Sequence, residues 1–186
     1  MGMPATEREW TAEMVRAIPD DRNQYQVVDG ELFVTPPPSW RHGDVVLELS
    51  LVLSHYLKKN PVGHLKVAPQ GVELDYRTLV EPDMFVVPMV DGKRPRKWED
   101  VRELLLAIEV LSPSTAGLDR RVKRVRYQRE GVPEYWIVDI DARLVERWSP
   151  SDDRPEIISQ EIEWNPVGAA ERLVIGLPKL FAGALE

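Results

Sequence analysis

The stretch from Leu104 to Val138 constrains the fold more than any other part of the chain. It opens with an apolar run, Leu104–Ile108, and closes with a second one, Tyr135–Val138, and each is typical of a buried strand. Between them lies a basic helical segment, Leu118–Glu130, which Gly131 is suited to end. Two buried strands joined by a helix predict that this stretch lies at the centre of a sheet-containing fold.

Helix and strand signals recur along the rest of the chain. The first predicted elements are a helix from a capping box at Thr6–Glu9 to Ile18, a hairpin around Asp29-Gly30 and an amphipathic helix over 44–59. Strands follow over 65–74, 80–87 and 104–110, and then a helix over 118–130. The last elements are a hairpin of strands over 134–139 and 143–148, a short edge strand at 156–159, an apolar segment at 173–177 and a C-terminal helix from Pro178. This order predicts an α/β (α+β) fold with a central mixed β-sheet flanked by helices.

The length of 186 residues, without an internal repeat or a flexible linker, predicts one domain. Within it we distinguish an N-terminal helix and hairpin (6–35), a core (40–150) and a C-terminal extension (151–186). No run of about eighteen apolar residues is present, so we expect no membrane span. The chain has no cysteine, which excludes disulfides and thiolate metal sites and suits a cytoplasmic protein.

Two acidic residues fall at the edges of predicted buried strands. Glu109 closes the first apolar run and is expected to share a face with Leu105 and Ala107. Asp83 is expected to share a strand face with Phe85. A buried carboxylate is costly unless a metal ion, a cationic side chain or a proton compensates it, so each residue needs such a partner.

The helix after Thr115 offers a cation. Asp119, Lys123 and Tyr127 recur four residues apart, so their side chains can contact one another. The packing stripe of the helix is expected from its apolar residues: Leu118, Val122 and Val125.

Asp83, Glu109 and Lys123, in a protein without cysteine, suggest oxygen ligation of a hard cation, Mg²⁺ or Mn²⁺. Such an ion polarises a phosphoryl oxygen and acidifies a bound water, and a nearby ammonium can stabilise the charge that develops on phosphorus. The spacing alone also fits a simpler interpretation, in which the acids pair with Arg or Lys and Asp119–Lys123 is a helix-surface ion pair.

The charge of the chain is uneven. A net charge of −7 argues against a surface that binds nucleic acid all over. Six basic residues nevertheless lie between Gly117 and Gly131, Arg120 and Arg124 among them, and a second basic cluster spans Lys93–Lys97. Either cluster can contact phosphates, or it can be an ordinary solvated surface.

Several segments together resemble one family. They are Asp29–Glu31, His42, Pro82-Asp83, Ile108–Thr115, Asp119, Lys123, Tyr127 and Gly131–Asp139. The pattern covers roughly residues 20 to 150 and resembles the Uma-type family of restriction-endonuclease-like proteins, within the PD-(D/E)XK nuclease superfamily.

The resemblance implies a restriction-endonuclease-like core and a cleavage site for DNA. The implied metal ligands are Asp83, Glu109 and the main chain of Val110, and the implied catalytic residues are Asp83, Glu109 and Lys123. The superfamily lysine would fall at Leu111, so Lys123 takes its role from the helix. The implied supporting residues are His42, Glu48, Asp119 and Tyr127. The sequence by itself favours an ordinary surface role for Glu48 and also fits a capping role for His42 near a helix start. The expected nucleic-acid contacts are Arg120 and Arg124.

Three functions remain open. The first is a Mg²⁺- or Mn²⁺-dependent DNA endonuclease, in which a metal-activated water attacks the phosphodiester in line. The second is a non-catalytic module that keeps the fold and binds nucleic acid or a protein partner. The third is a metal-dependent hydrolase of another phosphoester. We also expect a homodimer, with tryptophans as interface anchors: Trp10, Trp40, Trp98 and Trp164, while Trp136 and Trp148 pack in or near the sheet.

Overall fold

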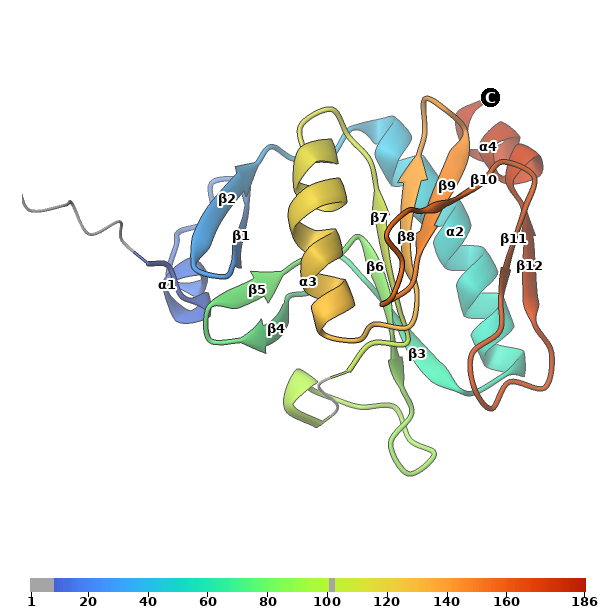
Figure 1. The fold of residues 1–186 in the computed structure, drawn as a ribbon, viewed down its shortest axis with the longest axis horizontal. Coiled ribbons are helices and arrows are strands. Elements are labelled where there is room, and N and C mark those ends of the chain that lie inside the picture. Colours follow the sequence, from blue (N-terminus) through green and yellow to red (C-terminus); the bar gives the residue numbers. More distant parts are fainter. Residues whose placement is uncertain (1–8, 101–102) are drawn as a thin grey trace, which may run out of the picture.

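The computed structural model describes residues 9–100 and 103–186. Its main sheet has six strands in the order β10-β9-β8-β7-β6-β3 (Figure 1). Their bounds are β3 Gly63–Val67, β6 Met84–Pro88, β7 Leu106–Val110, β8 Tyr135–Asp139, β9 Leu144–Trp148 and β10 Glu156–Ile158. The β7–β8 pair is parallel and the others are antiparallel, which confirms the predicted mixed sheet.

One face of this sheet packs against the helix α2 (Trp40–Lys59) and the C-terminal helix α4 (Leu177–Leu185). The hairpin of β11 (Glu161–Trp164) and β12 (Leu173–Gly176) packs into the same apolar cluster. Helix α2 begins four residues earlier than expected, because the Ser39 side chain accepts a hydrogen bond from the N–H of His42 and so caps the helix.

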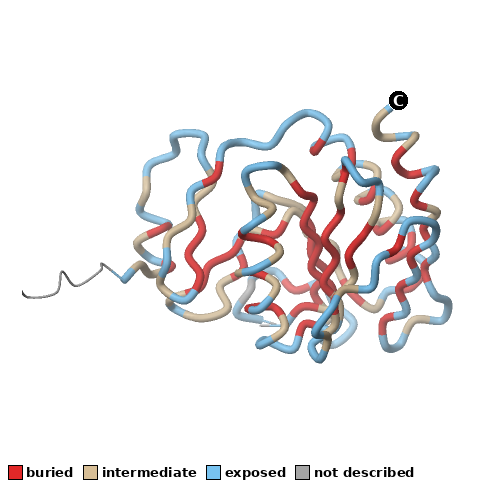
Figure 2. The backbone as a smooth tube through the Cα atoms, turned by 45° about the horizontal axis from the view of Figure 1, so that its top comes forward, coloured by how far each residue is buried: buried red, intermediate tan, exposed pale blue. Residues whose placement is uncertain are grey.

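The opposite face is covered by a helix and a second sheet. The π-helix η2 (Leu118–Lys123) continues into α3 (Arg124–Arg129), which lies in front of the sheet while α2 passes behind it (Figure 1). The second sheet has the order β2-β1-β5-β4. Its strands are β1 Gln24–Val28, β2 Glu31–Thr35, β4 Val72–Asp75 and β5 Thr78–Val80. The most buried segments are the central strands between these layers (Figure 2).

The expected stripe of η2 and α3 is only partly right. Leu118 is buried, but Val125 is 40% exposed. The side chains that face the sheet are instead those of Asp119, Lys123 and Tyr127, all buried. A polar stripe packs inward here because Glu109, on the facing strand, supplies a partner for the lysine.

Three predicted segments differ from the structure. The first helix, α1, spans only Ala12–Arg16 and is capped by Thr11, whereas most of the predicted capping box lies outside the described residues. The strand expected over 65–74 divides between β3 and β4, and the one over 80–87 divides between β5 and β6. Prolines cause both divisions, since neither Pro69 nor Pro82 has an N–H to donate to a strand ladder.

Smaller corrections concern single residues. Leu105 precedes β7 and packs on the α2 side, opposite to the face predicted for it. Trp136 and Trp148 are buried as expected, whereas Trp164 is buried in the α2 cluster and therefore cannot anchor an interface. Trp40 is 92% exposed.

A 3₁₀-helix, η1 (Trp98–Asp100), completes the elements. No helix in the described part of the chain is long and apolar enough to cross a membrane.

Candidate active site

The site lies where the start of β6 meets the end of β7. The ladder between these strands ends at Met84 and Ile108, so the next N–H of β7, that of Val110, has no strand partner on β6. The carboxylate of Asp83 replaces that partner, and its Oδ2 accepts the Val110 N–H at 2.7 Å. Asp83 is thereby fixed at the sheet edge just before β6, where the sequence predicts a second acid.

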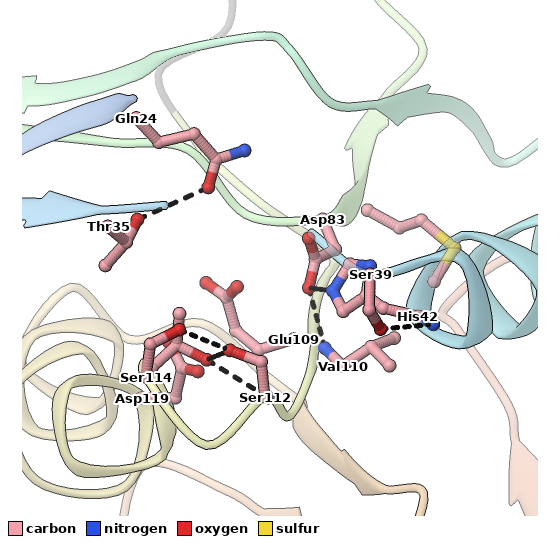
Figure 3. Close-up of polar contacts among 12 residues, drawn as sticks. Gln24, Thr35, Ser39, His42, Asp83, Glu109, Val110, Ser112, Ser114 and Asp119 are labelled. Atoms are coloured by element: carbon pink, nitrogen blue, oxygen red, sulfur yellow. Dashed lines mark hydrogen bonds and ion pairs between the residues drawn. The ribbon is translucent and has the colours of Figure 1, made fainter. Parts of the chain in front are cut away.

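His42 also holds Asp83. Its Nε2 lies 3.1 Å from the same Asp83 Oδ2, and both side chains are largely buried (Figure 3). Burial on its own would lower the pKa of His42, but the Asp83 carboxylate outweighs burial and raises the pKa above its ordinary value. The structure therefore places His42 beside a predicted metal ligand, as expected for a supporting residue.

Glu109 is the second acid, and it is almost fully buried. Its face alternates with that of Ile108 and Val110, so it points to the side of the sheet covered by η2 and α3. Its Oε1 accepts hydrogen bonds from Lys123 Nζ at 2.9 Å and from the Tyr127 hydroxyl at 3.4 Å. Burial raises the pKa of Glu109 well above its ordinary value, and Lys123 pulls it part of the way back.

Lys123 comes from the π-helix, where each turn is wider than an α-helical turn. The N–H of Arg124 donates to the carbonyl of Asp119, five residues earlier, which is the hydrogen bond that defines this geometry. Lys123 Nζ lies 3.2 Å from Asp119 Oδ1 in addition to its contact with Glu109. Burial opposes the charge of Lys123, but these two carboxylates outweigh it and raise its pKa, so the side chain is an ammonium at neutral pH.

Asp119 contributes to this arrangement through its carboxylate and through its main-chain carbonyl. Burial raises the pKa of its carboxyl group, and Lys123 opposes that shift. Its main-chain carbonyl accepts a hydrogen bond from the Tyr135 hydroxyl at 3.1 Å, which ties η2 to β8. The ring of Tyr135 packs against that of Tyr127, 4.8 Å between centroids. Asp119 therefore contacts Lys123 directly, whereas Tyr127 reaches it only through Glu109, the acid that both side chains contact.

All three predicted catalytic side chains line one pocket of about 20 Å³. In Figure 3 the carboxylates of Glu109 and Asp83 both face the space below Gln24 and Thr35. The pocket is lined by Gln24, Gln26, Pro36, Pro38, His42, Glu81, Asp83, Glu109, Val110, Ser112, Thr115 and Lys123.

Two polar residues of this pocket, Glu81 and Gln26, were not among those predicted from the sequence. Glu81 lies two residues before Asp83, and burial raises the pKa of its carboxyl group. The side chain of Gln26, itself buried, accepts the Glu81 N–H at 2.9 Å. The sequence contains one signal for Gln26. Gln24 and Gln26 lie two residues apart and so share one face of β1, a strand that ends in two apolar residues, Val27 and Val28.

The donor set fits a small, hard cation. Apart from the imidazole of His42, the lining side chains that could ligate are oxygen donors, and the carboxylates of Asp83, Glu109 and Asp119 outnumber the single ammonium of Lys123. Within the described residues no group of three or more acidic, histidine or cysteine side chains is arranged to hold a metal ion. Asp83 and Glu109 are the predicted ligands among the three carboxylates that line the pocket, the third being Glu81. A site with two carboxylate ligands suits Mg²⁺, an ion that usually keeps several waters.

The available oxygens can be named. Lys123 and Tyr127 already occupy Glu109 Oε1, and Val110 and His42 already occupy Asp83 Oδ2. Glu109 Oε2 and Asp83 Oδ1 accept no hydrogen bond from a described residue, so these are the two oxygens left for a cation.

Asp119 and Tyr127 lie behind the pocket lining, in contact with Lys123 and Glu109, whereas three other predicted residues lie outside both the pocket and these contacts. Glu48 faces α4, where its Oε2 lies 4.0 Å from the position that a side-chain Cβ would take at Gly183. Arg120 pairs with two acids of the sheet, 2.8 Å from Asp139 and 2.6 Å from Glu146.

Arg124 lies over the ring of Trp148, 4.6 Å from its centroid, and donates to Gln128 Oε1 at 2.7 Å. The guanidinium groups of Arg120 and Arg124 are thus engaged within the chain. These contacts argue against the predicted nucleic-acid role of the two arginines, because binding a phosphate would require breaking them.

Comparison with known proteins identifies the family of the chain. The model of the Uma2 family, described as "Putative restriction endonuclease", matches residues 12–179. A similar solved structure is "a putative nuclease belonging to DUF820" from Anabaena variabilis, with a TM-score of 0.74, 18% identity, and coverage of 95% of this chain and 99% of the other. No curated protein matches the chain. The family match spans most of the sequence, and the chain therefore belongs to the Uma2 family of restriction endonuclease-like proteins.

Proposed function

We propose that this protein is a divalent-metal-dependent endonuclease that hydrolyses phosphodiester bonds in DNA. The observation that carries the proposal is the convergence of Asp83, Glu109 and Lys123 on one pocket, from three separate segments of the chain. The two acids are held by neighbours that leave one carboxylate oxygen of each without a hydrogen bond from a described residue, and such an oxygen can bind a cation. Family membership supports a nuclease, and the pocket chemistry supports the metal.

The acids of the pocket and its lysine have different roles: the acids would bind the metal ion, and the lysine would stabilise negative charge. Asp83 and Glu109 would hold Mg²⁺ or Mn²⁺, which polarises a phosphoryl oxygen and acidifies a water molecule. Lys123 supplies a permanent positive charge close to that centre, because its pKa is raised by the acids around it. An ammonium fixed in place before the reaction stabilises the negative charge that develops on the phosphate. Asp119 and Glu109 hold this ammonium in place, and Tyr127 in turn donates a hydrogen bond to Glu109.

A plasmid cleavage assay tests this proposal. Wild-type protein should relax and linearise supercoiled DNA in Mg²⁺ or Mn²⁺ and should be inactive in EDTA. Asp83→Asn should lower the cleavage rate by at least about 100-fold, the equivalent of about 3 kcal/mol of transition-state stabilisation. Asp153→Asn, which changes an exposed aspartate outside the pocket, is the matched control and should cleave like wild type. Equal rates for wild type and Asp83→Asn would refute the proposal.

A non-catalytic binding module is the second candidate, and one observation favours it. Lys123 is shared between two buried acids, so part of its charge is already compensated within the chain. In that case the wild-type protein binds DNA but leaves the plasmid supercoiled in both metals, with the same affinity in Mn²⁺ and in EDTA.

Two copies of the chain would serve the two strands of a duplex. Trp40, Leu47 and Leu51 lie on one side of α2, seven and four residues apart, and each is more than half exposed. We propose this stripe as the homodimer contact, and light scattering on wild type and Leu47→Glu/Leu51→Glu tests it. The cysteine-free sequence supports a cytoplasmic location.

A further inference from the structure

The second basic cluster of the sequence lies beside β3, the edge strand of the main sheet. Lys66 of β3 pairs with Phe85 of β6, which pairs in turn with Ala107 of β7. Directly paired residues share a face, so Lys66 is on the same side of the sheet as Glu109, two residues beyond Ala107.

The ladder between β3 and β6 runs on to the candidate site. The N–H of Ala68 donates to the carbonyl of Asp83 at 3.0 Å, one step beyond the last named pair. Lys66 is therefore the diagonal neighbour of Asp83, at a Cα distance of about 7–8 Å for that relation in a sheet. A cation on β3 is close enough to Asp83 to contact the same nucleic-acid strand.

The loop after β6 brings more positive charge to this strand. Lys66, Arg96 and Lys97 line a groove of about 80 Å³ over Phe85 and Val87. The loop is held by Asp100, whose Oδ2 accepts the main-chain N–H of Arg96 and of Lys97, each at 3.3 Å. A second groove of about 340 Å³ lies between α2 and β3, and the residues that line it include Lys58, His64 and Arg94.

The charged groups of these side chains are not neutralised by an ion pair with a described residue, unlike those of Arg120 and Arg126 on η2 and α3. Among the described residues, Lys66, Arg94, Arg96 and Lys97 form no ion pair, whereas Arg120 and Arg126 are each paired with at least two acids. The surroundings of His64 agree, because burial and then the charges of Lys66 and Arg94 lower the pKa of its imidazole. A concentrated positive charge on a protein of net charge −7 favours a polyanion as the ligand.

We propose that β3 and the 93–97 loop form a surface that binds the phosphodiester backbone of DNA and leads one strand to Asp83. This inference rests on the proposed nuclease function and assigns the DNA contact to Lys66, Arg96 and Lys97 in place of the arginines of η2 and α3. The surface has a suitable length. The five residue-to-residue steps from Asp83 to Pro88 span about 17 Å, which corresponds to about five phosphates of one strand of B-DNA.

Fluorescence anisotropy with a labelled 20-base-pair duplex tests the surface, with Ca²⁺ or EDTA present so that binding is measured without cleavage. The test variant is Lys66→Gln/Arg96→Gln/Lys97→Gln. The matched control is Arg154→Gln/Arg172→Gln/Lys179→Gln, which removes the same charge from exposed positions elsewhere. Melting curves of both variants check that each is folded.

We expect the test variant to bind at least about 10-fold more weakly than wild type at 100 mM salt, with the slope of log K against log salt reduced by about one per lost phosphate contact. The control should stay within about 2-fold of wild type. Equal affinity and slope for wild type and the test variant would overturn the inference, as would an equal loss in the control. Asp83→Asn separates this result from the nuclease proposal, because it should bind DNA normally even where cleavage is lost.

Discussion

Lys123→Met should destabilise the protein strongly, because the lysine compensates two buried acids. Its ammonium lies 2.9 Å from Glu109 Oε1 and 3.2 Å from Asp119 Oδ1, and all three side chains are at most 3% exposed. Removing one partner from a buried ion pair typically costs about 3–5 kcal/mol, since the remaining charge is left without compensation. The acids can take up protons, so we expect the lower end, about 3 kcal/mol, and a melting temperature lowered by about 6–12 °C.

The pH dependence of this loss gives a sharper test. Glu109 already has a raised pKa, and without Lys123 it rises further. The folded variant then binds more protons than its unfolded chain, so its stability falls as the pH rises above the ordinary carboxyl range. Urea denaturation should therefore show a larger gap between wild type and Lys123→Met at pH 8 than at pH 5.

A second substitution and a control complete the test. Lys123→Met/Glu109→Gln should recover part of the lost stability, because it removes one uncompensated charge. Arg172→Met, which breaks an exposed ion pair with Glu163, should change stability by less than about 0.5 kcal/mol. A loss below about 1 kcal/mol for Lys123→Met, or the same gap at both pH values, would refute this reasoning.

Three further substitutions are predicted from contacts outside the pocket. Gly63→Ala should cost about 1–3 kcal/mol in urea denaturation, since its new Cβ would lie 2.7 Å from Val86 Cγ1 and 2.8 Å from the Val87 carbonyl oxygen. Arg126→Met should cost about 1–2 kcal/mol, because it breaks three ion pairs whose acids can partly rehydrate; a melting temperature equal to that of wild type would argue against this. Arg120→Gln should lower stability by about 1 kcal/mol but leave DNA affinity unchanged, and weaker binding in anisotropy would restore it to the DNA interface.

The strands of the core were predictable because their sequence signals are local. The apolar runs at β7 and β8 are long enough to show a buried strand, and the turn at Asp29-Gly30 has the positive φ angles, 51° and 89°, that its residues favour. The order of these elements then restricts the fold to a mixed sheet with helices on both faces.

The inward face of η2 and α3 was not predictable from helical periodicity. An apolar stripe normally points to the core, yet here Lys123 points inward and Val125 outward. The reason lies on another element, since Glu109 of β7 makes burial of the lysine favourable. A pattern within one helix contains no information about a partner on a strand.

The candidate site also contains both residues that were predicted from the sequence and residues that were not. Asp83, Glu109 and Lys123 could be grouped in advance because the resemblance joins them in one motif. Glu81 could not, because it enters the pocket through the packing of the small sheet on the large one, and for Gln26 the alternation with Gln24 showed a polar strand face but not what that face covers.

Isothermal titration calorimetry with Mn²⁺ tests most directly whether Asp83 and Glu109 share a cation. Wild type should bind Mn²⁺ saturably, and Asp83→Asn should lose that binding, because the two oxygens left by the surrounding hydrogen bonds belong to these two residues. Asp153→Asn should bind Mn²⁺ as wild type does. No saturable binding to wild type, or the same affinity in Asp83→Asn, would contradict a shared metal site and with it the proposed catalytic centre.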